Sequence, residues 1–268
     1  MFNIVMARLP EWLIFLIFPF GALLCIALLV SVFRKISGKL KLDDYDGDIL
    51  DTATQNTLSG AFVVLGFSLV LVMGTTDRFE SDVTTEATRI VSMDRLLVLE
   101  GSPQATALRG GLKQYSDSVV TDEWPMLSSG RGSKKTAGLL QDLFKELEQL
   151  KPQDPRQVSL YGDIVRKSDE IYHSRATRIL NSRSSLPTLF WIVNYLSLAG
   201  VIIIASLRLM QPTSMRILAL CTQIVLISVL FSAVLIIDHP FMGGTNISPD
   251  PIAKALVTLQ PPTPPAIQ

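Results

Sequence analysis

The sequence predicts an all-α membrane protein with four transmembrane helices and a helical extramembrane domain inserted between the second and third spans. Three observations predict this class: four long runs without charge, a charged stretch with helical periodicity between the second and third runs, and no alternating strand pattern of useful length. Lys and Arg (24) balance Asp and Glu (24), so the formal net charge is zero. Nucleic-acid binding normally requires an excess of basic residues, so we expect no nucleic-acid partner.

Four uncharged runs are long enough to cross a bilayer. They cover residues 12–33, 52–76, 186–207 and 217–237. A helix needs about 20 apolar residues to cross a hydrocarbon core of about 30 Å. Lipid offers the backbone no hydrogen-bond partners, so a single run of this length must be helical. The second run is rich in Gly and Ser around a dense apolar part, which allows it to approach another helix closely or to face a cavity.

The first run is predicted to be a retained helix rather than a cleaved signal peptide. It is too long for a typical signal peptide, and it ends in Phe33-Arg34-Lys35 instead of a small-residue cleavage site. Pro19 lies in its middle and is expected to bend the helix.

The connections between the runs are polar. Residues 34–51 begin with basic and end with acidic side chains, and we expect a solvated connector. The alternative of a calcium loop is disfavoured because the spacing does not follow the EF-hand pattern and no Glu closes it. Residues 208–216 are expected to form a tight turn containing Pro212.

The stretch 77–185 is predicted to be helical throughout. Apolar residues at helical spacing follow the second run directly, so that helix is expected to continue out of the bilayer without a break. Three more helices follow. The first is expected to begin at Ser102-Pro103, with Ser102 as N-cap, and to end near Trp124-Pro125. The second is expected to end at Lys151-Pro152, and the third to begin near Asp154-Pro155. Helices of this kind on a membrane stem often pack against copies of themselves.

The predicted organisation has four parts. Residues 1–76 hold the first two transmembrane helices and a short polar loop, residues 77–185 the helical domain, and residues 186–240 the last two transmembrane helices. Residues 241–268 are expected to be a C-terminal tail whose Pro-rich end is disordered.

Nothing in the sequence points to catalysis. The two histidines, His173 and His239, stand apart, and there is no zinc, nucleophile-elbow or phosphate-loop motif. We therefore expect no enzyme, no catalytic residue, no metal and no cofactor. The spans carry no charged residue, which argues against a proton relay or a voltage sensor. A channel with an apolar constriction that gates by dewetting is still allowed.

Several segments resemble bestrophins. Residues 58–72 (LSGAFVVLGFSLVLV) resemble their second membrane helix, and residues 238–244 (DHPFMGG) resemble their Asn-Pro-Phe-Gly stretch. The order of two spans, a long helical insertion and two further spans also matches. The bestrophin-like family called DUF4239 is more similar still. That similarity lies in Glu86-Ala87, in Tyr115 followed by Glu123-Trp124-Pro125-Met126, and in the pair Arg175 and Arg178. The resemblance covers about residues 10–255.

The resemblance implies a pentameric anion channel whose second helices surround the pore. Its partners would be the lipid bilayer, further copies of the chain and a permeant anion such as chloride. The Leu-Gly-Phe match places the narrow neck at Ser59, Val63 and Phe67, which also share one helical face by their spacing. Ser59 is small and polar where the family prefers a larger apolar group, which predicts a wider or shifted neck. Ordinary helix packing explains Val63 and Phe67 equally well.

The remaining motif residues are expected to be structural, as ion pairs and packing at the base of the helical domain. They are Glu86, Glu123, Trp124, Pro125, Arg175, Arg178, Pro240 and Phe241. The alternative is that Glu86 and Arg89, near a membrane helix end, attract or repel ions in a vestibule. The calcium-binding acidic run that bestrophins carry after Pro-Phe-Gly has no counterpart here, so calcium gating is not carried over.

Sidedness and function leave alternatives open. Basic residues near the span ends are almost balanced and lean weakly toward an external helical domain. The resemblance implies the opposite, and we expect a multi-pass protein of the cell membrane with a cytoplasmic helical domain. One function is an oligomeric ion channel, anion-conducting, with the pore lined by the second helix. The alternative is a non-conducting membrane scaffold or sensor whose helical domain binds a partner.

Overall fold

The computed structural model describes residues 10–36, 44–183, 186–210, 213–241 and 247–259. Pro212 and the Pro-rich end, expected in a turn and in a disordered tail, lie outside these residues. The chain divides into two compact units. The first joins Met1–Thr75 with Ser185–Asn246, and the second joins Thr76–Ser184 with Ile247–Gln268. None of the described residues lies in a strand, which confirms the all-α class.

The first unit contains the four predicted spans. They are α2 (Glu11–Ile36), the first part of α3 (Asp44–Glu100), α8 (Thr188–Arg208) and α9 (Ser214–Ile237). Each is long and apolar enough to cross a membrane, as predicted. Helix α2 continues through Pro19. The connector is shorter than expected, because α3 already begins at Asp44. Acidic residue types are favoured at the start of a helix by the helix dipole, so the sequence of this stretch is compatible with a helix.

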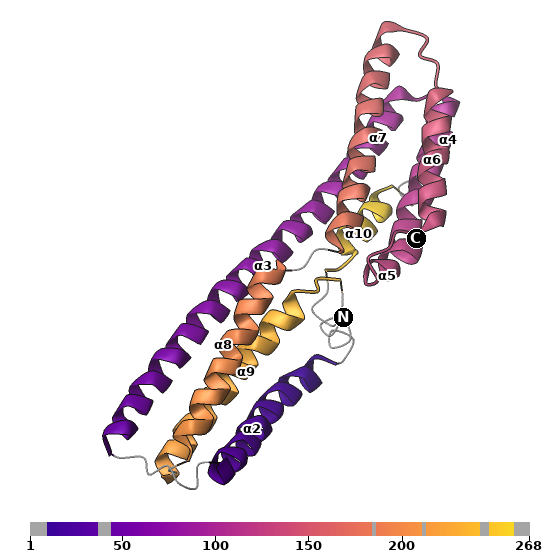
Figure 1. Ribbon diagram of the computed structural model, residues 1–268. Helices are drawn as coiled ribbons and strands as arrows, with labels where there is room; N and C mark the ends of the chain where they lie inside the picture. Colours follow the sequence, from indigo (N-terminus) through magenta and orange to yellow (C-terminus); the bar gives the residue numbers. More distant parts are fainter. Residues whose placement is uncertain (1–9, 37–43, 184–185, 211–212, 242–246, 260–268) are drawn as a thin grey trace, which may run out of the picture. The chain divides into compact units, whose positions relative to one another are not determined.

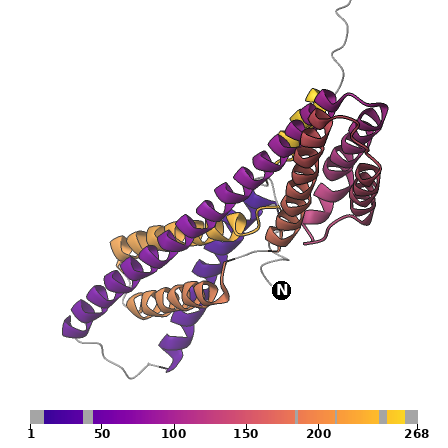
Figure 2. The same ribbon diagram turned by 90° about the horizontal axis from the view of Figure 1, so that it is seen from above.

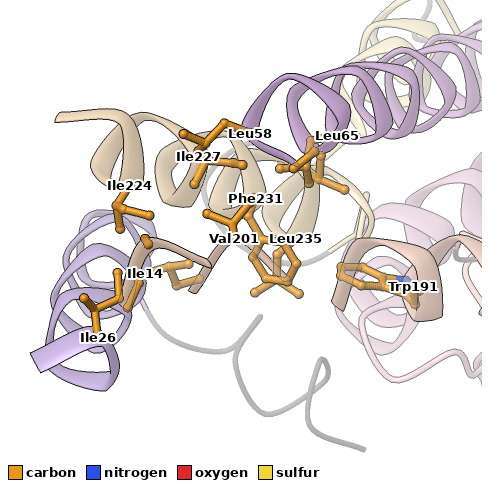
Figure 3. Close-up of a cluster of buried hydrophobic side chains, with 14 of the residues drawn as sticks. Ile14, Ile26, Leu58, Leu65, Trp191, Val201, Ile224, Ile227, Phe231 and Leu235 are labelled. Atoms are coloured by element: carbon orange, nitrogen blue, oxygen red, sulfur yellow. The ribbon is translucent and has the colours of Figure 1, made fainter. Parts of the chain in front are cut away.

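The core of the first unit joins all four helices (Figure 3). Helix α2 packs against both α8 and α9. Phe231 of α9 is the centre of an aromatic group, with ring centroids of Phe18 at 5.2 Å, Tyr195 at 5.6 Å and Trp191 at 5.9 Å. Lipid tails are as apolar as these side chains, so close van der Waals packing, rather than the hydrophobic effect, holds such helices together.

The second unit is built from helices around a separate core. Its elements are the second part of α3, α4 (Pro103–Ser118), η1 (Val119–Glu123), α5 (Trp124–Leu127), α6 (Lys134–Glu148), α7 (Pro155–Asn181) and α10 (Asp250–Thr258). Figure 1 shows α3 as one unbroken ribbon, which confirms the predicted continuous helix. Ser102 caps α4 by accepting from the Ala105 amide at 3.1 Å, and Asp154 caps α7, both as predicted. Figures 1 and 2 both show α4 and α6 side by side.

Two elements of the second unit differ from expectation. The helix expected to reach Trp124-Pro125 instead ends at Ser118 and passes into the π-helical turn η1 and the short α5. Residues 250–258, expected in the tail, form α10, which packs against α4 and buries Ile252 and Ala255. A helix of 9 residues is too short to show a clear periodic pattern in the sequence. Its stability comes from tertiary packing rather than from its own residues.

Candidate functional site

One side of α3 faces away from the first unit. Val63 is 57% exposed and Phe67 is 67% exposed, and Ser59 is exposed on the same face. On the other side, Leu58 and Leu65 enter the core (Figure 3). The three predicted neck residues therefore share one outward face of the first unit and pack little against the rest of that unit.

The exposed face of α3 differs from the exposed faces of α2 and α8. Large apolar side chains dominate those two faces, for example Phe20 and Leu24 on α2 and Leu196 on α8. On α3 the exposed set contains small or polar residues beside the apolar ones: Asn56, Ser59, Gly60, Val63, Phe67, Val70 and Gly74. Small residues permit close approach of another helix, and polar ones are costly against lipid.

A buried polar contact sets the rotation of α3. The Asn194 amide on α8 donates from Nδ2 to Ser68 Oγ at 2.9 Å, and the Ser68 hydroxyl donates to the Val64 carbonyl at 3.0 Å. Both side chains are fully buried. Ser68 points into the unit, whereas Phe67, about 100° away around the helix axis, is 67% exposed. The charge pattern of the spans gives no sign of the Ser68–Asn194 pair, because both residues are uncharged.

The second unit contains a buried ion network that joins three helical elements. Arg178 of α7 donates to Glu86 of α3 through Nε (2.9 Å to Oε2) and Nη2 (3.1 Å to Oε1). The same Nη2 lies 3.1 Å from Oε1 of Glu123 in η1. Arg175 Nη2 donates to Glu123 Oε2 at 2.5 Å. Two carboxylates thus meet two guanidinium groups, and the charges balance.

Tyr115 of α4 completes this network. Its hydroxyl lies 3.4 Å from Glu86 Oε1. Burial, followed by the negative charge of Glu86, raises the pKa of Tyr115 well above its ordinary value, so the hydroxyl stays protonated and can donate. Burial by itself lowers the pKa of Arg178, but the negative charges of Glu86 and Glu123 outweigh burial and raise that pKa.

The turn η1 places Glu123 inside the second unit. Glu123 is fully buried and also accepts from the backbone amide of Ser133 at 3.0 Å, just before α6. The ring of Trp124 lies 5.5 Å from Arg178 Cζ, and its Nε1 donates to the Ile247 carbonyl at 3.1 Å. Pro125 is exposed in the first turn of α5. Single π-turns of this kind are frequent at functional sites.

The remaining motif residues, Pro240 and Phe241, are buried and follow α9 in the first unit. Asp238, two residues earlier, accepts from the Leu186 amide at 2.5 Å and from Trp191 Nε1 at 3.2 Å. It therefore ties the end of α9 to the start of α8. The structure brings five of the motif residues together in the ion network, namely Glu86, Glu123, Trp124, Arg175 and Arg178.

The fold of this chain is similar to that of solved bestrophin homologues. A family model described as "Bestrophin-like domain" matches residues 12–252. A bacterial bestrophin homologue from Klebsiella pneumoniae has 14% identity and a TM-score of 0.59, over 92% of this chain and 94% of that chain. A crystal structure described only as a membrane protein has 13% identity and a TM-score of 0.58, over 91% of this chain and 97% of that chain. None of the curated proteins compared matches the chain.

Proposed function

Because this chain belongs to the bestrophin-like family, we propose that it is an oligomeric anion channel whose pore is lined by α3. The bestrophin-like fold suggests a family of oligomeric anion channels, and that resemblance extends over almost the whole chain. In this proposal Ser59, Val63 and Phe67 form the neck. Their side chains would meet those of neighbouring copies around a central axis.

The observation that carries this proposal is the outward face of α3. Val63 and Phe67 are more than half exposed, and small or polar residues flank them on that face. An apolar constriction between wetter ends is the arrangement that gates ion flow by dewetting. The buried Ser68–Asn194 pair supports the same orientation, because it holds a different side of α3 inside the unit.

Phe67→Ala tests the neck in planar bilayers. We expect a higher single-channel conductance, because loss of the ring widens the apolar constriction and lowers its dehydration barrier. Reversal potentials under a chloride gradient then measure whether anions pass in preference to cations.

Leu196→Ala is the matched control, since Leu196 on α8 is also 67% exposed but lies outside the proposed pore. Its conductance should equal that of the unaltered protein. A conducting protein in which Phe67→Ala changes nothing would remove α3 from the pore. A protein that carries no ions in liposomes, but retains a stable partner after crosslinking, would favour the scaffold or sensor function instead.

The proposed assembly is a homo-oligomer, a pentamer by family resemblance, in the cell membrane with the second unit in the cytoplasm. Particle images of the purified protein would show a ring with a central opening. A cysteine placed at the exposed Lys151, between α6 and α7, would resist impermeant thiol reagents in intact cells. Labelling of that cysteine from outside would reverse the proposed sidedness.

We assign the ion network to the support of the second unit rather than to contact with permeant ions. Glu86, Glu123 and Arg178 are at most 3% exposed, so their charges are not available at a vestibule surface. Arg89, the other vestibule candidate, pairs with Glu170 at 3.4 Å and with the Ser174 hydroxyl.

A further inference from the structure

A cavity of about 350 Å³ opens in the first unit, beside the early turns of α3, the end of α8 and the start of α9. Its polar lining includes Asp51 and Gln55 of α3, Arg208 of α8, and Arg216 and Gln223 of α9. Leu58 and Leu220 contribute apolar surface. None of these residues belongs to the proposed pore neck.

The charges in this cavity do not cancel. Arg208, whose side chain is only 3% exposed, holds Asp51 with two hydrogen bonds, from Nε to Oδ1 and from Nη2 to Oδ2. Arg216 Nη2 lies 3.6 Å from the same Oδ2, and its side chain is 43% exposed. One carboxylate thus faces two guanidinium groups. A partly exposed pair at this distance contributes little to stability, so the Arg216 guanidinium is available to a second anion.

The cavity lies where the spans reach the membrane interface. Arg208 directly follows the third uncharged run, Arg216 directly precedes the fourth, and Asp51 directly precedes the second. The apolar wall comes from residues within the runs, such as Leu58 and Leu220. The cavity is therefore cationic at the interface, and toward the hydrocarbon it is lined by Leu58 and Leu220 together with the amide of Gln223.

We propose that this cavity binds a phosphate-bearing anion, and that the anion is the headgroup of an anionic phospholipid. A guanidinium group presents paired N–H donors that match phosphate oxygens, and Gln55 and Gln223 offer neutral donors beside it. The apolar side chains can pack against the glycerol ester and first methylenes of a lipid, whereas a free ion would make no favourable contact with them. The inference does not depend on ion conduction.

The test is a lipid titration of the full-length purified protein followed by native mass spectrometry. Phosphatidylglycerol, phosphatidylcholine and inorganic phosphate are the three probes. Phosphatidylglycerol should be retained more strongly than phosphatidylcholine. Arg216→Gln removes the available charge but leaves the Arg208–Asp51 pair intact, and it should weaken phosphatidylglycerol binding about tenfold, as expected for one charge-assisted hydrogen bond.

Lys35→Gln is the control, since Lys35 is an exposed cation in the last turn of α2 and is absent from the cavity lining. It should leave phosphatidylglycerol binding unchanged. Equal loss in both variants, or equal retention of phosphatidylglycerol and phosphatidylcholine, would overturn the site. Inorganic phosphate that competes away the lipid at equal concentration would overturn the assignment to a phospholipid. A melting curve of Arg216→Gln in detergent matching that of the unaltered protein would show that lost binding is not lost folding.

Discussion

Asn194 and Ser68 form a fully buried hydrogen bond between α8 and α3, with 2.9 Å between Nδ2 and Oγ. Around the axis of α3 the contact lies about 100° from Phe67, which is 67% exposed. A single polar pair inside an apolar bundle has few alternative partners, so it specifies one rotation of the helix. This relationship connects the packing of the first unit to the face proposed to line the pore.

Asn194→Leu should destabilise the first unit by about 1 kcal/mol, the usual value for a polar contact between membrane helices. Ser68 would keep its own bond to the Val64 carbonyl, so the loss stays modest. Thermal unfolding of the purified protein in detergent measures the change. In a double-mutant cycle with Ser68→Ala, the two effects should not add, because both variants remove the same bond. Strict additivity would show that the pair contributes no coupling.

Arg178→Met should lower the unfolding free energy by about 3–5 kcal/mol, because it leaves Glu86 buried without its cationic partner. Arg166→Met is the control, since its pair with Asp163 is exposed and 2.7 Å long, and its loss should cost under about 1 kcal/mol. Chemical denaturation followed by the helical signal compares the two. Adding Glu86→Gln to Arg178→Met should recover part of the stability, since the unpaired charge is gone. Equal, small effects of both Arg variants would contradict a stabilising network.

Gly130→Ala should destabilise the second unit by about 1–2 kcal/mol, because Gly130 has a φ of +66°, where a Cβ is unfavourable. An added Cβ would also lie 2.8 Å from Arg183 Cγ, close to the bond that Arg183 Nε donates to the Gly130 carbonyl. Gly110→Ala is the matched control. It lies in α4, where an added methyl group would meet nothing within 4 Å, and it should stabilise by about 0.5–1 kcal/mol. Relative to the unaltered protein, the melting temperature should fall for Gly130→Ala and rise for Gly110→Ala.

Sequence patterns with a local physical cause predicted the structure well. The four spans follow from uncharged length, since lipid accepts only self-bonded helices of that length. The starts of α4 and α7 follow from Ser102-Pro103 and Asp154-Pro155, where the capping side chain reaches an amide three residues on. The continuity of α3 follows from an unbroken apolar stripe. Where the pattern was weak, at η1 and α10, the expectation was wrong or incomplete.

The sequence alone determined a membrane-spanning, all-helical chain. The free energy of transferring an apolar run into lipid and the capping of a helix end both depend on residues close together in the sequence. The partners of the polar side chains required the folded chain: Ser68 with Asn194, Asp51 with Arg208, and Glu86 with Arg178. Each pair joins residues far apart in sequence, on helices whose faces become neighbours only on packing. Their geometry follows from helix rotation and register, which depend on the combined packing of many side chains and carry no short-range signature.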